Sequence, residues 1–172
     1  YKEKIIPFLS KTDAHSTLIG AVNYITKDKL HFIGGNTDWI GFKNSIIWLE
    51  NTGFYNPRQI DKKQAVLIGY GGSAKAVIYA LEKMNFDSVF VWNRSFDKIK
   101  NLRSFGALRI YPKKLETKNF KIKKEISLVV NTIPSKKPYE TQNKNTTLNK
   151  EKKAYGFDLV YAAETGFLNL FS

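Results

Sequence analysis

Apolar runs and helical patterns alternate along the chain from residue 65 to its end. The apolar runs predict strands at 65–68, 89–92, 108–111, 127–132 and 154–159, and the periodic segments predict helices to about Asn85 and, after Trp92, through Phe105. Parallel strands need a crossover, usually a helix, to return the chain to the same edge of the sheet. The alternation therefore predicts an α/β fold, a parallel sheet with helices on both faces.

The residues before 65 carry shorter elements in a different order. Their patterns predict a short helix at 3–10 bent at Pro7, strands at 21–26 and 30–34 joined by the polar turn 27–29, and a helix at 39–49 capped by Thr37 or Asp38. The segment 51–63 contains glycine and proline and breaks the pattern. We therefore predict one domain at 1–61 and a second at 62–172.

A glycine-rich turn follows the first apolar run of the second domain. It has the spacing G-x-G-x-x-A, with Gly69, Gly71 and Ala74 at the small positions, and a helical pattern comes next. The first glycine allows a tight turn, the second lets backbone approach a pyrophosphate, and the alanine lets the helix pack on the strand. Gly72 and Ser73 complete the turn at the helix N-terminus, whose free N–H groups bind phosphate. Such turns also occur where a strand simply folds back into a helix, but in this βαβ order we predict a Rossmann-type dinucleotide site.

The end of the next strand distinguishes between the nicotinamide cofactors. An acidic residue there accepts hydrogen bonds from the ribose of NAD, but this chain has Asn93, Arg94 and Ser95, with Lys98 three residues further on. A guanidinium pairs with a 2′-phosphate through two charge-assisted hydrogen bonds, whereas a carboxylate would repel it. An isolated Arg is usually a solvated surface residue, but at this position we interpret Arg94 as selecting NADP.

The charge balance is strongly basic, with 28 Lys and Arg against 15 Asp and Glu and a net charge of +13. A basic protein raises nucleic-acid binding as an alternative. However, 24 of these residues are Lys and only 4 are Arg, and sequence-reading contacts depend mainly on Arg. We therefore expect no nucleic-acid partner, and a positive field that steers a phosphorylated cofactor and a carboxylate substrate.

Other residue types narrow the class further. The chain has no Cys, and His15 and His31 stand apart, so we predict neither disulfides nor a metal site. No apolar run approaches the length of a membrane span and no signal-peptide pattern opens the chain, so we expect a cytoplasmic protein without a membrane partner. Because the chain starts at Tyr1 rather than Met, we expect it to be a fragment.

Several short motifs follow one another in a fixed order over nearly the whole chain. They are Tyr1-Lys2-Glu3 (the end of an N-V-T-x-P-x-K-E motif), G-A-V-N at 20–23, N-T-D at 36–38, the glycine turn, N-R-S at 93–95, N-T-I-P at 131–134, and D-L-V-Y at 158–161 with Thr165 and Leu168. Each motif alone is weak, but together and in this order they resemble the shikimate dehydrogenase family.

The resemblance implies NADPH-dependent, reversible reduction of 3-dehydroshikimate to shikimate. Lys2 and Asp38 match the family's catalytic pair, and Asn23 and Tyr161 match substrate-binding positions. Hydride addition to a ketone leaves an alkoxide that must gain a proton, which a lysine ammonium can supply. Thr132 lies in a loop expected at the carboxyl edge of the sheet, where we place the cofactor. Residues 1–61 would then be part of a smaller α/β substrate domain.

The chain also departs from the family pattern. Trp39 stands where Gly is usual, Tyr24 where Thr is usual, and Ala162-Ala163 where Asn-Pro is usual. The family's N-terminal serine pair and its C-terminal glutamine segment are not in this sequence. Three alternatives therefore stay open: a quinate/shikimate dehydrogenase with relaxed cofactor choice, a catalytically silent NADP-binding paralogue, and a basic nucleic-acid-binding protein. Whether the protein forms a homodimer is also open.

Overall fold

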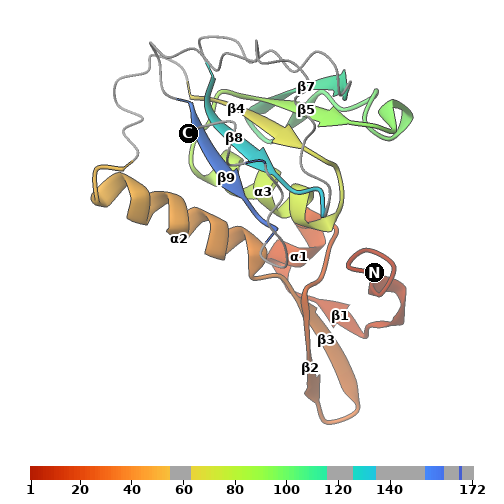
Figure 1. Ribbon diagram of the computed structural model, residues 1–172. Helices are drawn as coiled ribbons and strands as arrows, with labels where there is room; N and C mark the ends of the chain where they lie inside the picture. Colours follow the sequence, from red (N-terminus) through yellow and green to blue (C-terminus); the bar gives the residue numbers. More distant parts are fainter. Residues whose placement is uncertain (55–62, 116–125, 135–153, 161–166, 168–172) are drawn as a thin grey trace.

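The computed structural model describes residues 1–54, 63–115, 126–134, 154–160 and 167. Its largest element is a six-stranded sheet of order β6-β7-β5-β4-β8-β9 (Figure 1). The strands and the two helices that pack on them are β4 (Gln64–Ile68), β5 (Ser88–Asn93), β6 (Ser104–Phe105), β7 (Leu108–Lys114), β8 (Ile126–Asn131), β9 (Tyr155–Asp158), α2 (Asp38–Asn51) and α3 (Gly72–Lys83). All neighbouring strands are parallel except β6 and β7. The predicted α/β class is confirmed.

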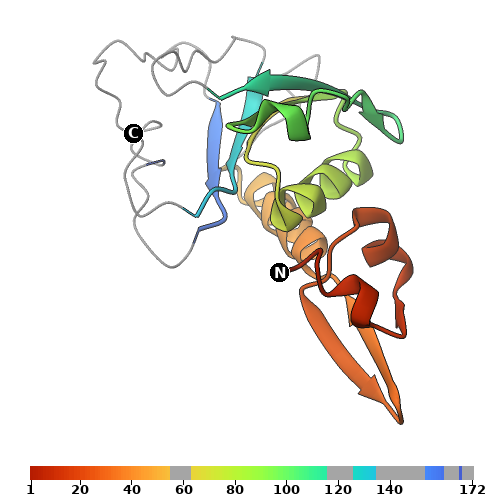
Figure 2. The same cartoon turned by 90° about the vertical axis from the view of Figure 1, so that its right-hand side faces the viewer.

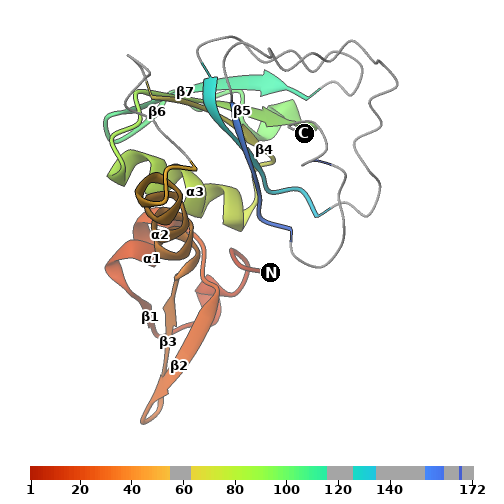
Figure 3. The ribbon, with the colours of Figure 1, turned by 60° about the vertical axis from the view of Figure 1, so that its left-hand side comes forward.

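Side chains that alternate along the strands build a core on each face of this sheet. Ala65 and Leu67 of β4 belong to the larger core, which includes buried residues of α3 and α2. Val66 and Ile68 point to the opposite face, where Phe167 is fully buried among them. Figure 3 shows α3 and α2 beneath the same face of the sheet. Because β4, β5 and β8 are buried on both faces, their sequences are largely apolar runs.

A smaller sheet of order β1-β3-β2 lies apart from the large one. Its elements and their neighbours are η1 (Ile6–Phe8), β1 (Lys11–Thr12), α1 (Ala14–Ile19), β2 (Tyr24–Asp28) and β3 (His31–Gly35). In Figure 2 the β2–β3 hairpin extends away from the large sheet. Among the helices of the described ranges, none is both long and apolar enough to cross a membrane. The division into 1–61 and 62–172 stays a prediction.

The helix predicted through Phe105 is wrong. Only a three-residue 3-10 helix, η3 (Phe96–Lys98), forms there, and the chain then enters β6, where Phe105 pairs with Leu108. Gly106, between these two residues, has a φ of +56° and lets the chain reverse. Ile99, Leu102 and Phe105 have helical spacing, but they reach the core from a turn and a hairpin.

The N-terminal elements also differ in their boundaries. The predicted helix at 3–10 is only η1, and the strand predicted at 21–26 begins at Tyr24, with the turn at 29–30 instead of 27–29. The sequence pattern does not predict α1, which is short. Asp13 caps this helix by accepting a hydrogen bond from Ser16 N at 2.6 Å, and Gly20 ends it with a φ of +69°.

Candidate active site

Lys2 and Asp38 lie together although 36 positions separate them in the chain. The Lys2 ammonium forms a short ion pair with Asp38 Oδ2 and donates a hydrogen bond to Ser73 Oγ at 3.1 Å. A backbone hydrogen bond also holds Lys2 in place, because Val22 N donates to Lys2 O at 2.8 Å. The Lys2 and Asp38 side chains are 37% and 29% exposed. A small molecule can therefore reach the pair.

Asn23 holds the second carboxylate oxygen of Asp38. Its Nδ2 donates to Asp38 Oδ1 at 2.6 Å and to Thr37 Oγ1 at 3.0 Å, and Thr37 N donates to Asn23 Oδ1 at 3.0 Å. Thr37 is the N-cap residue of α2, but its hydroxyl serves Asn23 rather than the helix N–H groups. Each oxygen of Asp38 thus has its own partner, Lys2 or Asn23, and the carboxylate has a fixed orientation.

The side chain of Asn36 also supports this arrangement. Asn36 was not among the predicted site residues. It is 3% exposed. Its Nδ2 donates to Ala21 O at 2.9 Å, and its Oδ1 accepts from Asp38 N at 3.0 Å. The side chain therefore ties the first turn of α2 to the segment that carries Asn23. The signal in the sequence is an amide placed directly before a helix start, which often forms such a bond.

The glycine turn has the shape that a dinucleotide requires. Gly69 has a φ of +103°, and an added Cβ would lie 2.5 Å from Thr132 Oγ1. Gly71 is the N-cap of α3 with no side-chain cap, and a Cβ there would meet nothing within 4 Å. There is thus open space beside Gly71 at the uncapped N-terminus of α3, which suits a pyrophosphate. Ala74 is fully buried, as its packing role predicts.

The residues predicted to select the cofactor follow β5 at the same edge of the sheet. Asn93 Nδ2 donates to Ser95 O at 3.0 Å, so this amide shapes the loop itself. Arg94, Ser95 and Lys98 are exposed. Because β4 and β5 are parallel and adjacent, this loop lies beside the glycine turn.

Thr132 lies on the other side of the glycine turn. Its N and Oγ1 both donate to Ile68 O, at 2.9 and 2.7 Å. The buried Asn131 donates to Asp158 Oδ1 at 3.0 Å and accepts from Ile133 N at 3.1 Å. Asn131 and Asp158 thus join the ends of β8 and β9, a structural role that the sequence motifs did not specify. The predicted substrate residue Tyr161 lies outside the described residues.

A second ion pair lies close to the glycine turn. Lys75 Nζ is 2.7 Å from Glu3 Oε2 and 5.8 Å from the centroid of the Tyr70 ring. Burial raises the pKa of Tyr70, with Lys75 opposing and Glu3 adding to this shift. The residue that follows Lys2 is therefore tied to the same helix that carries Ser73.

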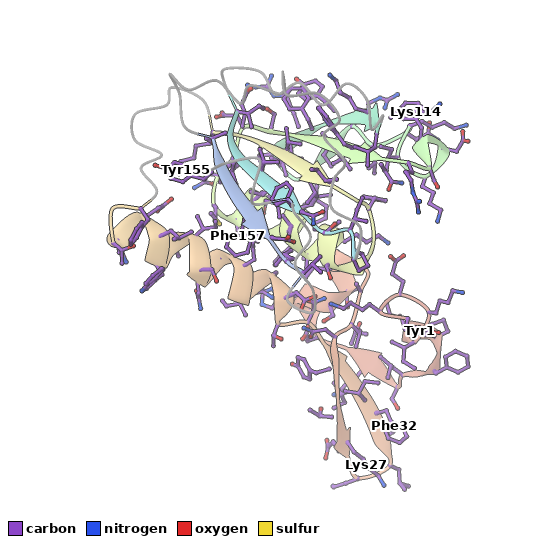
Figure 4. All side chains as sticks on the ribbon, in the orientation of Figure 1. Tyr1, Lys27, Phe32, Lys114, Tyr155 and Phe157 are labelled. Atoms are coloured by element: carbon purple, nitrogen blue, oxygen red, sulfur yellow. The ribbon has the colours of Figure 1, made fainter. Side chains whose placement is uncertain are left out.

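An open hollow of about 530 Å³ lies on the flank of α2, lined by Asn44, Ser45, Trp48, Leu49 and Phe157. Figure 4 shows Phe157 on β9 facing α2. Its lining has no charged side chain, and Trp48 is ten residues beyond Asp38, or about 15 Å along a helix. The hollow is therefore separate from the Lys2–Asp38 pair, which remains the candidate site.

The mostly parallel sheet, with a glycine turn that opens a helix between its central strands, defines a Rossmann-type dinucleotide-binding protein. Residues 54–161 match the model of the family described as shikimate / quinate 5-dehydrogenase. The chain belongs to this family.

Comparisons with individual proteins and solved structures support this membership of the family. The shikimate dehydrogenase (NADP(+)) of Carboxydothermus hydrogenoformans is 36% identical over 177 residues, covering 98% of this chain and 59% of that protein. The crystal structure of shikimate dehydrogenase from Aquifex aeolicus has a TM-score of 0.68 at 28% identity, covering 98% of this chain and 58% of that one. The Thermus thermophilus shikimate 5-dehydrogenase in complex with NADP(H) and shikimate has a TM-score of 0.56 at 27% identity, covering 77% and 44%. The chain thus spans between 44% and 59% of the length of these proteins.

Proposed function

We propose that this chain forms the cofactor site and the proton-transfer pair of an NADP-dependent shikimate dehydrogenase, which interconverts 3-dehydroshikimate and shikimate. The observation that carries the proposal is the position of the Lys2 ammonium. It contacts Asp38 on one side and, on the other, Ser73 in the first turn of the helix that follows the glycine turn. The names of the relatives, which include NADP(+) and shikimate, support the same cofactor and substrate.

The residues of the site suit the proton transfer that this reaction needs. When bound, NADPH supplies a hydride to the carbonyl carbon of the ketone. The carbonyl oxygen then gains negative charge, and the ammonium of Lys2 stabilises this charge and gives the oxygen a proton. In the reverse direction the neutral Lys2 amine takes the proton of the substrate hydroxyl. Asp38 holds the Lys2 side chain in place through both steps, and Asn23 in turn holds Asp38.

The cofactor phosphates fit two separate positions. The pyrophosphate would lie over Gly71 at the N-terminus of α3, where there is space and where N–H groups lack a side-chain cap. A 2′-phosphate would lie beside the loop after β5, with Arg94, Ser95 and Lys98 as its partners. The quinate alternative with relaxed cofactor choice is less favoured, because it would not need Arg94.

The test is turnover by the full-length protein and by its Lys2→Ala and Asp38→Asn variants, followed as NADPH formation from NADP and shikimate. We expect each variant to lose about 10²- to 10⁴-fold in kcat, the usual contribution of a positioned proton donor, while NADPH binding stays close to that of the unchanged protein. Unchanged turnover in Lys2→Ala would remove Lys2 as the proton-transferring group.

Parallel assays separate the alternatives. Equal rates with quinate, or with NAD in place of NADP, would favour the relaxed enzyme, and NADPH binding without turnover would favour a silent paralogue. The 172-residue chain alone is expected to bind NADPH with little turnover, because it spans 59% of the Carboxydothermus relative and substrate positioning is sensitive to missing contacts.

A further inference from the structure

Residues of the glycine turn contact Lys2 and also border the proposed position of the cofactor. Ser73 Oγ lies 3.1 Å from Lys2 Nζ, across 71 positions of sequence. A Cβ on Gly72 would lie 2.8 Å from Lys2 Cβ and 3.3 Å from Ala21 Cβ. Gly72 therefore has to be small because the segment carrying Lys2 passes directly over it. Figures 1 and 3 show the N-terminus between the large and the small sheet, where this segment lies.

The neighbouring residues hold the same segment in place. Glu3 pairs with Lys75 at 2.7 Å, and Val22 N donates to Lys2 O at 2.8 Å. The Lys2 carbonyl is thus tied to the residues before β2, and the side chain of the next residue, Glu3, is tied to α3. The hydrogen-bond partners of the ammonium, Asp38 and Ser73, then set the direction in which it points.

We propose that the Ser73 hydroxyl is a positioning group for Lys2 and not a cofactor contact. An ammonium has three N–H donors. Asp38 takes one and Ser73 takes a second, which leaves the third for the oxygen of the substrate. With Asp38 alone, the ammonium could rotate and present its donors in several directions. The proposal rests on the proposed function, because it assigns Ser73 to the lysine that gives the proton.

The alternative role for Ser73 is the one that its place in the turn predicts, a direct hydrogen bond to the cofactor. The two roles differ in what a Ser73→Ala variant would lose. A cofactor contact would raise the dissociation constant of NADPH. A positioning contact would lower kcat while leaving NADPH binding unchanged.

The experiment compares Ser73→Ala, Ser73→Thr and Ser95→Ala in the full-length protein. For Ser73→Ala we expect kcat to fall about 10- to 100-fold, the range for a misplaced reacting group, with the NADPH dissociation constant unchanged. Ser73→Thr keeps a hydroxyl and should restore kcat. Ser95→Ala removes an equivalent hydroxyl at the other end of the cofactor site and should weaken NADPH binding instead.

A readout without turnover uses the chain itself. Lys2 and Lys4 are acylated by an N-hydroxysuccinimide ester, and the two rates are compared by mass spectrometry. In Ser73→Ala the Lys2 rate should rise relative to that of the exposed Lys4, and in Ser95→Ala the ratio should not change. An unchanged ratio in Ser73→Ala, weaker NADPH binding with unchanged kcat, or failure of Thr to restore kcat would each overturn the proposal. A failure of the proposed function is distinguished from a failure of this proposal, because turnover would then survive in Lys2→Ala.

Discussion

Two glycines of the same turn should respond in opposite ways to alanine. Gly69 has a φ of +103°, and an added Cβ would lie 2.5 Å from Thr132 Oγ1. That oxygen cannot easily move, because it donates to Ile68 O at 2.7 Å. Gly71 has an ordinary φ of −109°, and an added Cβ would meet nothing within 4 Å. Gly69→Ala should therefore damage folding, and Gly71→Ala should damage cofactor binding alone.

The magnitude for Gly69→Ala follows from three effects. A side chain at this positive φ costs about 1–3 kcal/mol of free energy of unfolding, and forcing a methyl group against the Thr132 hydroxyl costs roughly another 1–3 kcal/mol. Against this, alanine makes the unfolded chain less flexible, which returns about 0.4–1 kcal/mol. The expected net loss is about 1–5 kcal/mol with a central value of about 3 kcal/mol, a large part of the stability of an ordinary domain.

The assay is urea unfolding of the unchanged chain and both variants, with NADPH titrated into each folded protein. Gly69→Ala should unfold at a clearly lower urea concentration with a similar m-value. Gly71→Ala should unfold within about 0.5 kcal/mol of the unchanged chain but bind NADPH much more weakly, since its Cβ fills the space over the helix N-terminus. A Gly69→Ala protein of unchanged stability, or a Gly71→Ala protein with unchanged NADPH affinity, would refute this reasoning.

Three other outcomes can be measured on the chain. Arg94→Ala should remove a preference for NADPH over NADH of about 1–3 kcal/mol, measured by fluorescence transfer from Trp to the nicotinamide; equal affinities in the unchanged chain would contradict the assignment. Burial raises the pKa of Asp13, but the polar groups of Ser16 and Asn36 and the charge of His15 together outweigh burial and lower this pKa below its ordinary value of 3.8. The Asp13 cap therefore stabilises α1 above that pH and loses its effect as the pH falls through the folded pKa, so Asp13→Ala should cost about 1 kcal/mol at pH 7 and less at pH 3, with Asp13→Asn as the control. Nucleic-acid binding in a gel-shift series should be weak and abolished by moderate salt; binding that persists would favour a nucleic-acid partner.

The central strands β4, β5 and β8 could be predicted from the sequence because each is a largely apolar run that is buried on both faces of the sheet. The error through Phe105 has a clear cause. Ile99, Leu102 and Phe105 recur at helical spacing, and only the positive φ of Gly106 shows that the chain turns back. Local periodicity does not reveal such a reversal, because the pairing of Phe105 with Leu108 forms only in the folded sheet.

The sequence pointed to part of the candidate site. The family resemblance paired Lys2 with Asp38, but the motifs assigned Ser73 to the cofactor alone and gave Asn36 no role. The contacts of Lys2 with Asp38 and Ser73 span 36 and 71 positions of sequence, a separation over which neither spacing nor propensity carries information. The same limit explains Gly72. Its place in the turn suggests a phosphate contact, whereas the structure shows that a Cβ there would strike Lys2. The residues of a glycine-rich motif can thus be small for two different reasons. In this turn they would leave room both for a cofactor and for the lysine that would act on the substrate.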